Sequence, residues 1–259
     1  MKTVIITGAT SGIGLELVKL FEKNKIHVIK ISRSLNNPEF DEYGCDVSNF
    51  DEVASTFELI AKKHKHIDLL INSAGFGLFG ATEFLPIEEC KKQFEVNFFG
   101  ALYCSKCVLP LMTSTSKIIN ISSACALFSL PFRSLYSASK AALNSLTFGM
   151  RNELKNSGIC VSSICPGDIK TNFTKNRVKY FDTNIRYGNQ VENSSNFMES
   201  KNSSRMSAGY ASNKIFKICS KRKTKAMYIV GFKYKIFNFL YRIFPTSWFY
   251  DVIHKIFVK

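Results

Sequence analysis

Short apolar runs alternate along the chain with longer segments in which apolar residues recur every three or four positions. The short runs predict β-strands and the longer segments predict helices. Several runs are apolar nearly throughout, which is typical of parallel strands that helices cover on both faces. The alternation therefore predicts a doubly wound α/β fold with a mostly parallel, seven-stranded sheet. The predicted strands are Thr3–Thr7, His27–Ile31, a short one near Tyr43–Asp46, Ile67–Asn72, Lys117–Ser122, Ile159–Cys165 and Met227–Val230, and the predicted helices span residues 12–23, 51–64, 88–112 and 136–157.

The alternation weakens after Thr171. Residues 184–213 are rich in Asn and Ser and poor in apolar residues, and a predicted strand follows them. They therefore indicate a mobile surface loop or insertion rather than a linker between domains. We expect one domain over residues 1–259, with a polar loop or insertion at 172–213 and an aromatic, basic tail at 232–259.

Charge is distributed unevenly over the chain of 259 residues, whose net charge is +15. Residues 1–170 hold 18 Lys and Arg against 16 Asp and Glu, whereas residues 171–259 hold 17 against 4. A basic last third suggests a nucleic acid, an anionic membrane surface or an acidic ligand, and a solvated lysine-rich surface is the alternative. A hydrophobic content of 46% excludes disorder as the overall class.

Targeting and metal-binding signals are weak. The first predicted strand runs directly into a glycine-rich turn, so we expect no secretory signal, and no apolar run reaches the length of ~18 residues that a membrane span needs. Cys104 and Cys107 form a CxxC pair without a second pair at zinc spacing, which favours buried thiols over a metal site. We therefore expect reduced cysteines, a cytoplasmic location and no bound metal.

A glycine-rich turn, Thr7-Gly8-Ala9-Thr10-Ser11-Gly12-Ile13-Gly14, follows the first predicted strand and opens the first predicted helix. Glycines at such a corner allow close approach of the backbone to a ligand, and N–H groups at a helix start attract phosphate. The spacing differs from that of the general dinucleotide fingerprint, and a purely structural turn is the alternative. Its position directly after a strand favours a nucleotide site.

The turn resembles the cofactor loop of the short-chain dehydrogenase/reductase family. Three further motifs resemble those of the family in the same order: Asp46-Val47, Asn72-Ser73-Ala74-Gly75 and Pro166-Gly167-Asp168-Ile169-Lys170-Thr171. The resemblance covers about residues 2–175 and implies a Rossmann-type fold with a single dinucleotide-binding and catalytic domain. The cofactor-binding residues that it implies are Gly8, Thr10, Ser11, Gly12, Ile13, Gly14, Asp46, Val47, Asn72, Ala74, Gly75, Tyr136, Lys140, Pro166, Gly167, Ile169 and Thr171.

Arg33 bears on which nicotinamide nucleotide is used. Enzymes that prefer NAD usually place an acid at the end of the second strand, where it accepts a hydrogen bond from the ribose 2′-hydroxyl. Here the strand ends in Ile31-Ser32-Arg33-Ser34, and an arginine at that place can pair with a 2′-phosphate. We expect NADP(H) as the preferred cofactor, with NAD(H) and an ordinary loop cation at Arg33 as alternatives.

Tyr136 and Lys140 are four residues apart in a predicted helix, which places both side chains on one face. A tyrosine at its ordinary pKa of ~10 is a poor acid–base group near neutral pH, and a neighbouring ammonium lowers that pKa. The spacing alone is common in helices. The context of the other motifs makes it a candidate catalytic pair.

The resemblance supplies the remaining members of that site. The family's catalytic serine lies thirteen residues before its tyrosine, which here is Ser123, at the carboxyl end of the fifth predicted strand. Asn97 resembles the family's helical asparagine. By resemblance, Ser123 hydrogen-bonds the substrate oxygen, Tyr136 exchanges the proton, Lys140 also holds the nicotinamide ribose, and Asn97 supports a proton relay through water. Ala126 stands where family members often have Gly.

These features together imply an NADP(H)-dependent oxidoreductase that transfers hydride between nicotinamide and a carbonyl or alcohol. A catalytically silent cofactor-binding regulatory protein of the same fold is the alternative, and the intact Ser123, Tyr136 and Lys140 argue against it. We expect a small-molecule substrate and a homodimer or homotetramer. Nucleic acid is not expected, because no reading motif accompanies the charge.

An apolar cluster near the motifs bears on the substrate. If half of its members face the pocket, the substrate is an apolar ketone, aldehyde or alcohol, such as a lipid or a steroid-like molecule. Packing within the protein or at a subunit interface is an equally open alternative. By resemblance, the segment 172–213 covers the substrate. The cluster comprises Phe76, Leu78, Phe79, Phe128, Leu130, Pro131 and Phe132.

The tail at 232–259 combines aromatic and basic residues, and Pro245 interrupts any helix in it. Two short amphipathic helices there could lie on an anionic bilayer with their aromatic side chains at the level of the headgroups. Packing of the aromatic face on the body of the protein or on a second subunit is the alternative. A peripheral membrane contact is thus expected only for this tail.

Overall fold

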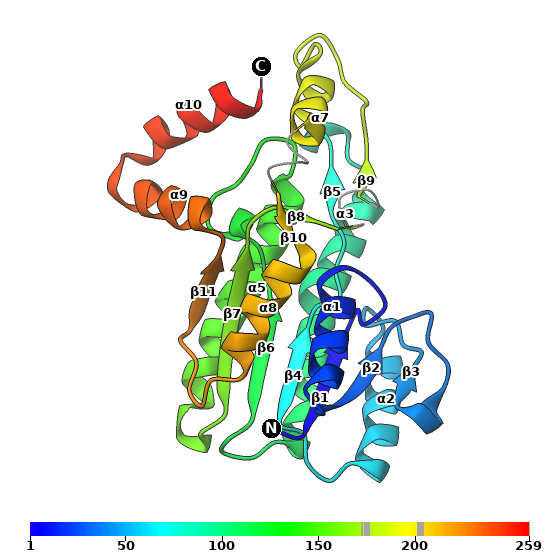
Figure 1. Cartoon of the computed structure of the whole chain (residues 1–259). Coiled ribbons are helices and arrows are strands. Elements are labelled where there is room, and N and C mark those ends of the chain that lie inside the picture. The colour runs from blue at the N-terminus through cyan, green and yellow to red at the C-terminus, as the bar shows by residue number, and fades with distance from the viewer. Residues whose placement is uncertain (172, 174–176, 201–204, 259) are drawn as a thin grey trace.

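A seven-stranded sheet lies between two layers of helices (Figure 1) in the computed structural model, which describes residues 1–171, 173, 177–200 and 205–258. Its strands are β1 (Thr3–Thr7), β2 (His27–Ile31), β3 (Glu42–Tyr43), β4 (Leu69–Asn72), β6 (Lys117–Ile121), β7 (Cys160–Pro166) and β11 (Met227–Val230). Their order is β11-β7-β6-β4-β1-β2-β3, and every neighbouring pair is parallel. The predicted Rossmann-type doubly wound fold is confirmed.

Two hydrophobic cores form because successive side chains of a strand point to opposite faces. On β1, Val4 and Ile6 face one core and Ile5 faces the other. The first core is covered by α1 (Gly12–Lys23) and α8 (Ala208–Cys219). The second is covered by α2 (Phe50–Lys63), α4 (Gly100–Val108) and α5 (Ser134–Glu153).

The predicted helix at 88–112 is built from several pieces. They are α3 (Ile87–Phe94), a π-helical turn (Glu95–Phe99), α4 and a 3-10 turn (Leu109–Leu111). The apolar spacing does not distinguish these pieces, because it does not reveal whether a turn bonds its backbone in the α, π or 3-10 pattern. A π-helical turn inside an α-helix is frequent at functional sites, and this one contains Asn97.

The segment predicted as a polar loop at 172–213 contains more regular structure than expected. It holds α7 (Gln190–Ser200), β9 (Val178–Lys179), β10 (Met206–Ser207) and the start of α8. Of the predicted loop or insertion, the loop is therefore wrong for these parts, because Val191 and Met198 of α7 are buried beside Phe79 and Phe132. The insertion alternative stays open. The sequence signal for α7 is weak, because only two of its buried residues are apolar and they lie seven positions apart. Residues 172, 174–176 and 201–204 of the segment lie outside the described residues.

Two small pairings attach this segment to the domain. β9 lies parallel to β5 (Leu78–Phe79), and β10 lies parallel to β8 (Ile169–Lys170). Both pairings lie beyond the carboxyl ends of the central strands (Figure 1). The segment is therefore placed on the side of the sheet where a ligand would bind.

The tail forms the two short helices that the sequence predicts, α9 (Phe232–Ile243) and α10 (Thr246–Phe257), and Lys259 lies outside the described residues. Phe249 and Ile253 of α10 are buried against Phe128 and Leu130. One face of the tail thus packs on the body of the protein. No helix within the described residues combines the length and apolar character needed to cross a bilayer.

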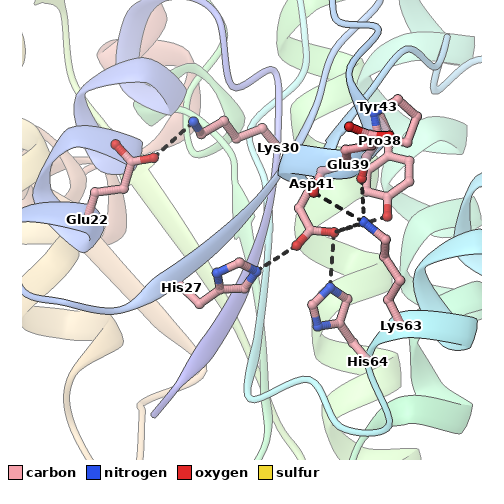
Figure 2. Close-up of polar contacts among 9 residues, drawn as sticks. All are labelled: Glu22, His27, Lys30, Pro38, Glu39, Asp41, Tyr43, Lys63 and His64. Carbon is pink, nitrogen blue, oxygen red and sulfur yellow. Dashed lines mark hydrogen bonds and ion pairs between the residues drawn. The ribbon is translucent and has the colours of Figure 1, made fainter.

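A polar cluster closes the β3 edge of the sheet (Figure 2). Asp41 accepts hydrogen bonds from His27 Nε2 at 2.8 Å, His64 Nε2 at 3.0 Å and the Tyr43 hydroxyl at 3.1 Å. Its carboxylate also lies 3.6 Å from Lys63 Nζ. The two histidines and Asp41 lie close enough together to ligate a metal, but the adjoining ammonium opposes a cation at that oxygen. The cluster thus ties β2, β3 and the end of α2 together.

We expect Asp41→Asn to destabilise the protein in a pH-dependent way. Burial alone would raise the pKa of Asp41, but hydrogen bonds from His64 and His27 hold it below its usual value. Such a carboxylate stabilises the fold fully above its unfolded pKa of about 4, and the effect is lost as pH falls through the lower folded pKa. At pH 7 the variant should lose about 1.5–3 kcal/mol in urea unfolding, and less at acidic pH. The exposed Asp182→Asn is the control, and a loss independent of pH would contradict the expectation.

Candidate active site

A cleft opens where the carboxyl ends of β1, β4, β6 and β7 meet. These ends share one edge of the sheet because all the strands are parallel, and the strand order reverses between β1 and β4, where doubly wound folds bind their ligands. The cleft encloses about 330 Å³ and is lined by the turns that follow these four strands and by the start of α5. Most of the predicted cofactor residues line it: Gly8, Ser11, Gly12, Ile13, Arg33, Ala74, Gly75, Tyr136, Lys140, Pro166, Gly167, Ile169 and Thr171.

The glycine turn is shaped by close packing on one side and open space on the other. Gly8 and Gly12 have positive φ angles, +67° and +54°. A Cβ at Gly8 would lie 2.9 Å from the Ala74 backbone, whereas a Cβ at Gly12 would meet only Thr171, at 3.9 Å. Ser11 precedes α1 without capping it through its side chain. The first N–H groups of α1 are therefore available to an anion such as a phosphate.

Five predicted cofactor residues, Thr10, Gly14, Asp46, Val47 and Asn72, do not line the cleft. The Asn72 side chain donates to Asn120 Oδ1 at 2.8 Å, inside the protein. Val47 packs where a side chain at Gly100 would collide with it, and a side chain at Gly14 would collide with the Gly8 carbonyl. Asn72, Val47 and Gly14 thus make close contacts within the protein. Cofactor contacts by these five residues stay a prediction.

Ser123, Tyr136 and Lys140 lie in the same cleft. Ser123 follows β6, and its Oγ accepts from the Cys125 N–H at 3.2 Å and forms a hydrogen bond with Tyr136. Lys140 Nζ donates to the Ile121 carbonyl at 2.9 Å. The end of β6 and the first turns of α5 therefore present a hydroxyl, a phenol and an ammonium to one space.

The ionisation of Tyr136 is set mainly by its burial. Burial raises the pKa of Tyr136 to about 12, and the charges that oppose this rise are those of Arg177 and Arg133. Burial lowers the pKa of Lys140 to about 8, and its ammonium is directed at the Ile121 carbonyl. The charge of Lys140 is not among the main influences on the pKa of Tyr136, and the expected lowering by Lys140 stays a prediction. Tyr136 keeps its proton at neutral pH and is suited to donate it.

Asn97 lies behind the cleft rather than in its lining. Its Oδ1 accepts from the Phe76 N–H at 3.0 Å, and its Nδ2 donates to the Phe76 carbonyl at 3.0 Å and to Ser139 Oγ at 3.1 Å. A Cβ at Gly75 would lie 2.8 Å from Asn97 Oδ1. The side chain thus fixes the turn after β4 against α5, and its predicted part in a proton relay stays a prediction.

The predicted apolar cluster lies mostly away from the cleft. Of its seven members only Phe76 is in the lining. Phe128 and Leu130 pack against α10, and Phe79 and Phe132 pack against α7. The alternative in which these side chains pack within the protein therefore holds for four of them, and the basis for predicting an apolar substrate is largely removed.

Three charged residues in the lining were not among the predicted site residues: Arg133, Asp168 and Arg177. Asp168 belongs to a motif already quoted, whereas Arg177 is one of many cations in the basic last third. No local pattern distinguishes an arginine that lines a cleft from one that faces solvent. The ring of Tyr234, from α9, covers Gly167 so closely that any side chain there would collide with it.

Comparison with known proteins decides the family. A family model described as short chain dehydrogenase matches residues 2–180. The chain belongs to the short-chain dehydrogenase/reductase family. This short-chain dehydrogenase/reductase is accordingly an NAD(P)-dependent oxidoreductase that acts on CH–OH or C=O groups.

Similarity extends beyond the motifs. The chain is 37% identical over 266 residues to a probable short-chain type dehydrogenase/reductase, VdlC, of Helicobacter pylori, a match that covers 98% of this chain and 97% of the relative. The structure of a short-chain dehydrogenase from Streptomyces avermitilis has a TM-score of 0.80 at 25% identity. This match covers 98% of this chain and 94% of the Streptomyces chain. The structure of ElxO with NADP bound has a TM-score of 0.72 at 25% identity, and the match covers 88% of this chain and 96% of the ElxO chain. The likeness thus includes the C-terminal third, where the motifs run out.

The raised pKa of Tyr136 predicts opposite pH dependences for the two directions of the reaction. Carbonyl reduction needs the protonated phenol, so its kcat/KM should stay level around neutral pH. Alcohol oxidation needs the phenolate, so its kcat/KM should rise about tenfold per pH unit below the pKa. Tyr136→Phe should abolish both activities and leave cofactor binding within a few-fold. The exposed Tyr210→Phe is the control, and turnover by Tyr136→Phe would refute the assignment.

Proposed function

We propose that this short-chain dehydrogenase/reductase is an NADP(H)-dependent oxidoreductase that interconverts a carbonyl group and an alcohol in a small molecule. The observation that carries the proposal is that Ser123, Tyr136 and Lys140 share one cleft with the glycine turn at which α1 begins. A phosphate-binding feature and an acid–base set are thereby within reach of a single ligand. The intact acid–base set, with Ser123 and Lys140 buried and Tyr136 partly buried, also disfavours a catalytically silent regulatory protein.

The residues present fit a nicotinamide dinucleotide. Gly12 is open toward the cleft and the first turn of α1 carries no acidic residue, so a diphosphate meets free N–H groups there. When bound, the nicotinamide supplies or accepts the hydride. In reduction, the Ser123 hydroxyl holds the substrate oxygen by a hydrogen bond, and Tyr136 transfers its phenolic proton to that oxygen. Lys140 and the turn at Gly75 are placed to hold the nicotinamide end.

The preference for NADP(H) rests on Arg33. Its side chain is 73% exposed at the rim of the cleft, and its Nη1 lies 4.0 Å from Asp46 Oδ2. Hydrogen bonds from Ser48 outweigh burial and hold the pKa of Asp46 below its usual value, so the carboxylate stays charged and orients the guanidinium. An exposed guanidinium in this place can bind a 2′-phosphate. The NADP bound to ElxO supports the same preference.

Arg33→Ala should shift the cofactor preference. Loss of a charge-assisted contact should raise KM for NADPH about tenfold or more, while KM for NADH changes less than about threefold. The measurement is oxidation of both cofactors against a panel of ketones and aldehydes graded by length and polarity. Tyr136→Phe serves as the blank and the exposed Arg222→Ala as the matched control. A wild type that prefers NADH, unchanged by Arg33→Ala, would remove the NADP(H) assignment.

We further propose that α9 rests on an anionic membrane surface. Phe232, Ile236, Phe239 and Ile243 are exposed at spacings of four, three and four residues, which form one stripe along the helix. The opposite face carries Tyr234, Phe237 and Tyr241, which pack on the protein. Exposed apolar stripes of this kind mark interaction sites.

Charge favours a membrane over a second subunit at this stripe. The tail 232–259 has five Lys and Arg against one acidic residue, and the exposed Lys235 and Arg242 lie beside the stripe. Phe244 and Trp248 stack at the bend between α9 and α10, with ring centroids 4.5 Å apart. Basic and aromatic residues together bind the headgroups of anionic lipids. A homodimer or homotetramer and a cytoplasmic location stay part of the proposal, and the eight free thiols support the latter.

The double variant Phe239→Ser/Ile243→Ser should no longer float with phosphatidylglycerol vesicles, whereas the wild type should float at low salt and less at high salt. The double variant Phe40→Ser/Ile87→Ser, at exposed positions outside the tail, is the matched control. Light scattering is measured in parallel. A wild type that never floats, and an oligomer that the α9 variant dissociates, would show that the stripe is a subunit interface and refute the membrane contact.

A further inference from the structure

Two arginines, Arg133 and Arg177, line the cleft beside the catalytic tyrosine. Both charges act on the Tyr136 phenol and on each other. Neither arginine belongs to the glycine turn, and the two lie 44 positions apart in the sequence. The tertiary structure therefore gathers two guanidinium groups at the place where the reaction occurs.

Arg133 is the residue immediately before α5 and is 3% exposed. Its Nη1 lies 3.9 Å from Asp168 Oδ1 and 4.0 Å from Cys125 Sγ, and its Nη2 contacts the Met198 sulfur. Its Nε is buried without a hydrogen-bond partner among the described residues. Sulfur is a weak acceptor, so most of the donors of this guanidinium are poorly satisfied. An unsatisfied buried donor is costly unless a ligand supplies its partner.

Arg177 reaches the same space from the other side. A Cβ at Gly77 would lie 3.2 Å from Arg177 Nε and 3.3 Å from the Phe173 ring. That ring in turn has its centroid 5.9 Å from the centroid of Tyr136. Arg177 is therefore packed near the reacting end of the cleft. Burial and the facing charge of Arg133 lower its pKa to about 10, which leaves it charged at neutral pH.

The charges within the cleft do not balance. Its described lining holds Arg33, Arg133, Lys140 and Arg177 against the single carboxylate of Asp168. Asp168 is 45% exposed and also hydrogen-bonds Tyr234, so it compensates Arg133 only in part. Arg133 is buried and Arg177 is half-buried. Two like charges so poorly exposed to water, with one shared counter-ion, destabilise a protein unless an anion joins them.

The dinucleotide's own phosphates do not account for this anion. Arg133 contacts Cys125, Asp168 and Met198, and Arg177 lies beside Gly77. None of these residues belongs to the glycine turn, where the phosphates would bind. A guanidinium presents paired donors that match a carboxylate or a phosphate.

We propose that Arg133 and Arg177 bind an oxyanion of the substrate, a carboxylate or a phosphate carried close to the carbonyl or alcohol that reacts. The substrate class is then an oxo or hydroxy compound with an acidic group, rather than a purely apolar molecule. This assignment rests on the proposed oxidoreductase function for its reaction but not for its binding site. Binding and turnover can therefore be tested separately.

The test compares each anionic compound with a neutral partner that keeps the same reacting carbonyl group. Levulinate and longer oxo acids are paired with their methyl esters, and acetonyl phosphate with hydroxyacetone, which distinguishes a carboxylate from a phosphate. In the wild type with NADPH, the anion should have a kcat/KM at least tenfold above that of its neutral partner. Arg177→Gln should reduce kcat/KM for the anion by about tenfold to a hundredfold, mainly through KM, and change that of the neutral partner less than about threefold.

Binding is measured independently by quenching of NADPH fluorescence in Tyr136→Phe, which holds the probes without turnover. Adding Arg177→Gln to this variant should remove the preference for the anion and leave NADPH affinity unchanged. Arg186→Gln is the matched control, since Arg186 is 70% exposed and pairs with Glu83 at 3.1 Å. Because Arg133 is buried, a loss of binding in Arg133→Gln would not separate misfolding from the loss of an anion contact. Arg177→Gln is therefore the variant that decides whether the anion site exists.

Equal binding of acid and ester, or an anion preference that Arg177→Gln leaves intact, would overturn the anion site. A retained anion preference in binding, without turnover of any compound by the wild type, would instead refute the oxidoreductase function and uphold the site. The two proposals thus fail in different ways.

Discussion

A chain of buried side-chain hydrogen bonds lies beneath the cleft, and the positions of the catalytic groups depend on it. Asn72 of β4 donates to Ser105 of α4 at 3.0 Å and to Asn120 of β6 at 2.8 Å, and Asn120 donates to Thr147 of α5 at 2.9 Å. All four residues are buried, so each bond is made in a medium of low dielectric constant. Because the strands are parallel and Thr7 lies level with Asn72, the turns after β1, β4 and β6 open toward one another. The helix that carries Tyr136 is fastened to the same strands.

The C-terminal third of the chain covers the side of the cleft that lies away from the central sheet. Tyr234 of α9 covers Gly167, Met198 of α7 contacts Arg133, and Phe249 of α10 packs on Phe128. The body supplies the glycine turn and the acid–base groups, while these later elements surround the side on which a substrate would lie. α9 therefore contributes Tyr234 to the cleft and an exposed apolar stripe to the surface.

Electrostatics in the cleft are dominated by positive charge. Arg33 is exposed at the rim, Lys140 is buried beside β6, and Arg133 and Arg177 lie near Tyr136. Burial keeps the tyrosine protonated, and the two arginines moderate that effect. The cations that give residues 171–259 a net charge of +13 are therefore not equivalent: Arg177 lines the cleft, whereas the basic residues of α9 are exposed to solvent.

The sequence by itself determined the sheet, the boundaries of α1, α2 and α5 to within a few residues, and the catalytic motifs, because strand and helix periods are local and each motif lies in one short stretch of chain. It could not reveal which apolar faces are covered or which charged side chains are buried. Phe128 and Phe132 are as apolar as a pocket lining would be, yet α10 and α7 cover them. The meeting of Arg133 with Arg177 was decided only by the tertiary structure, because the surroundings of a charged side chain are set by contacts between distant parts of the chain.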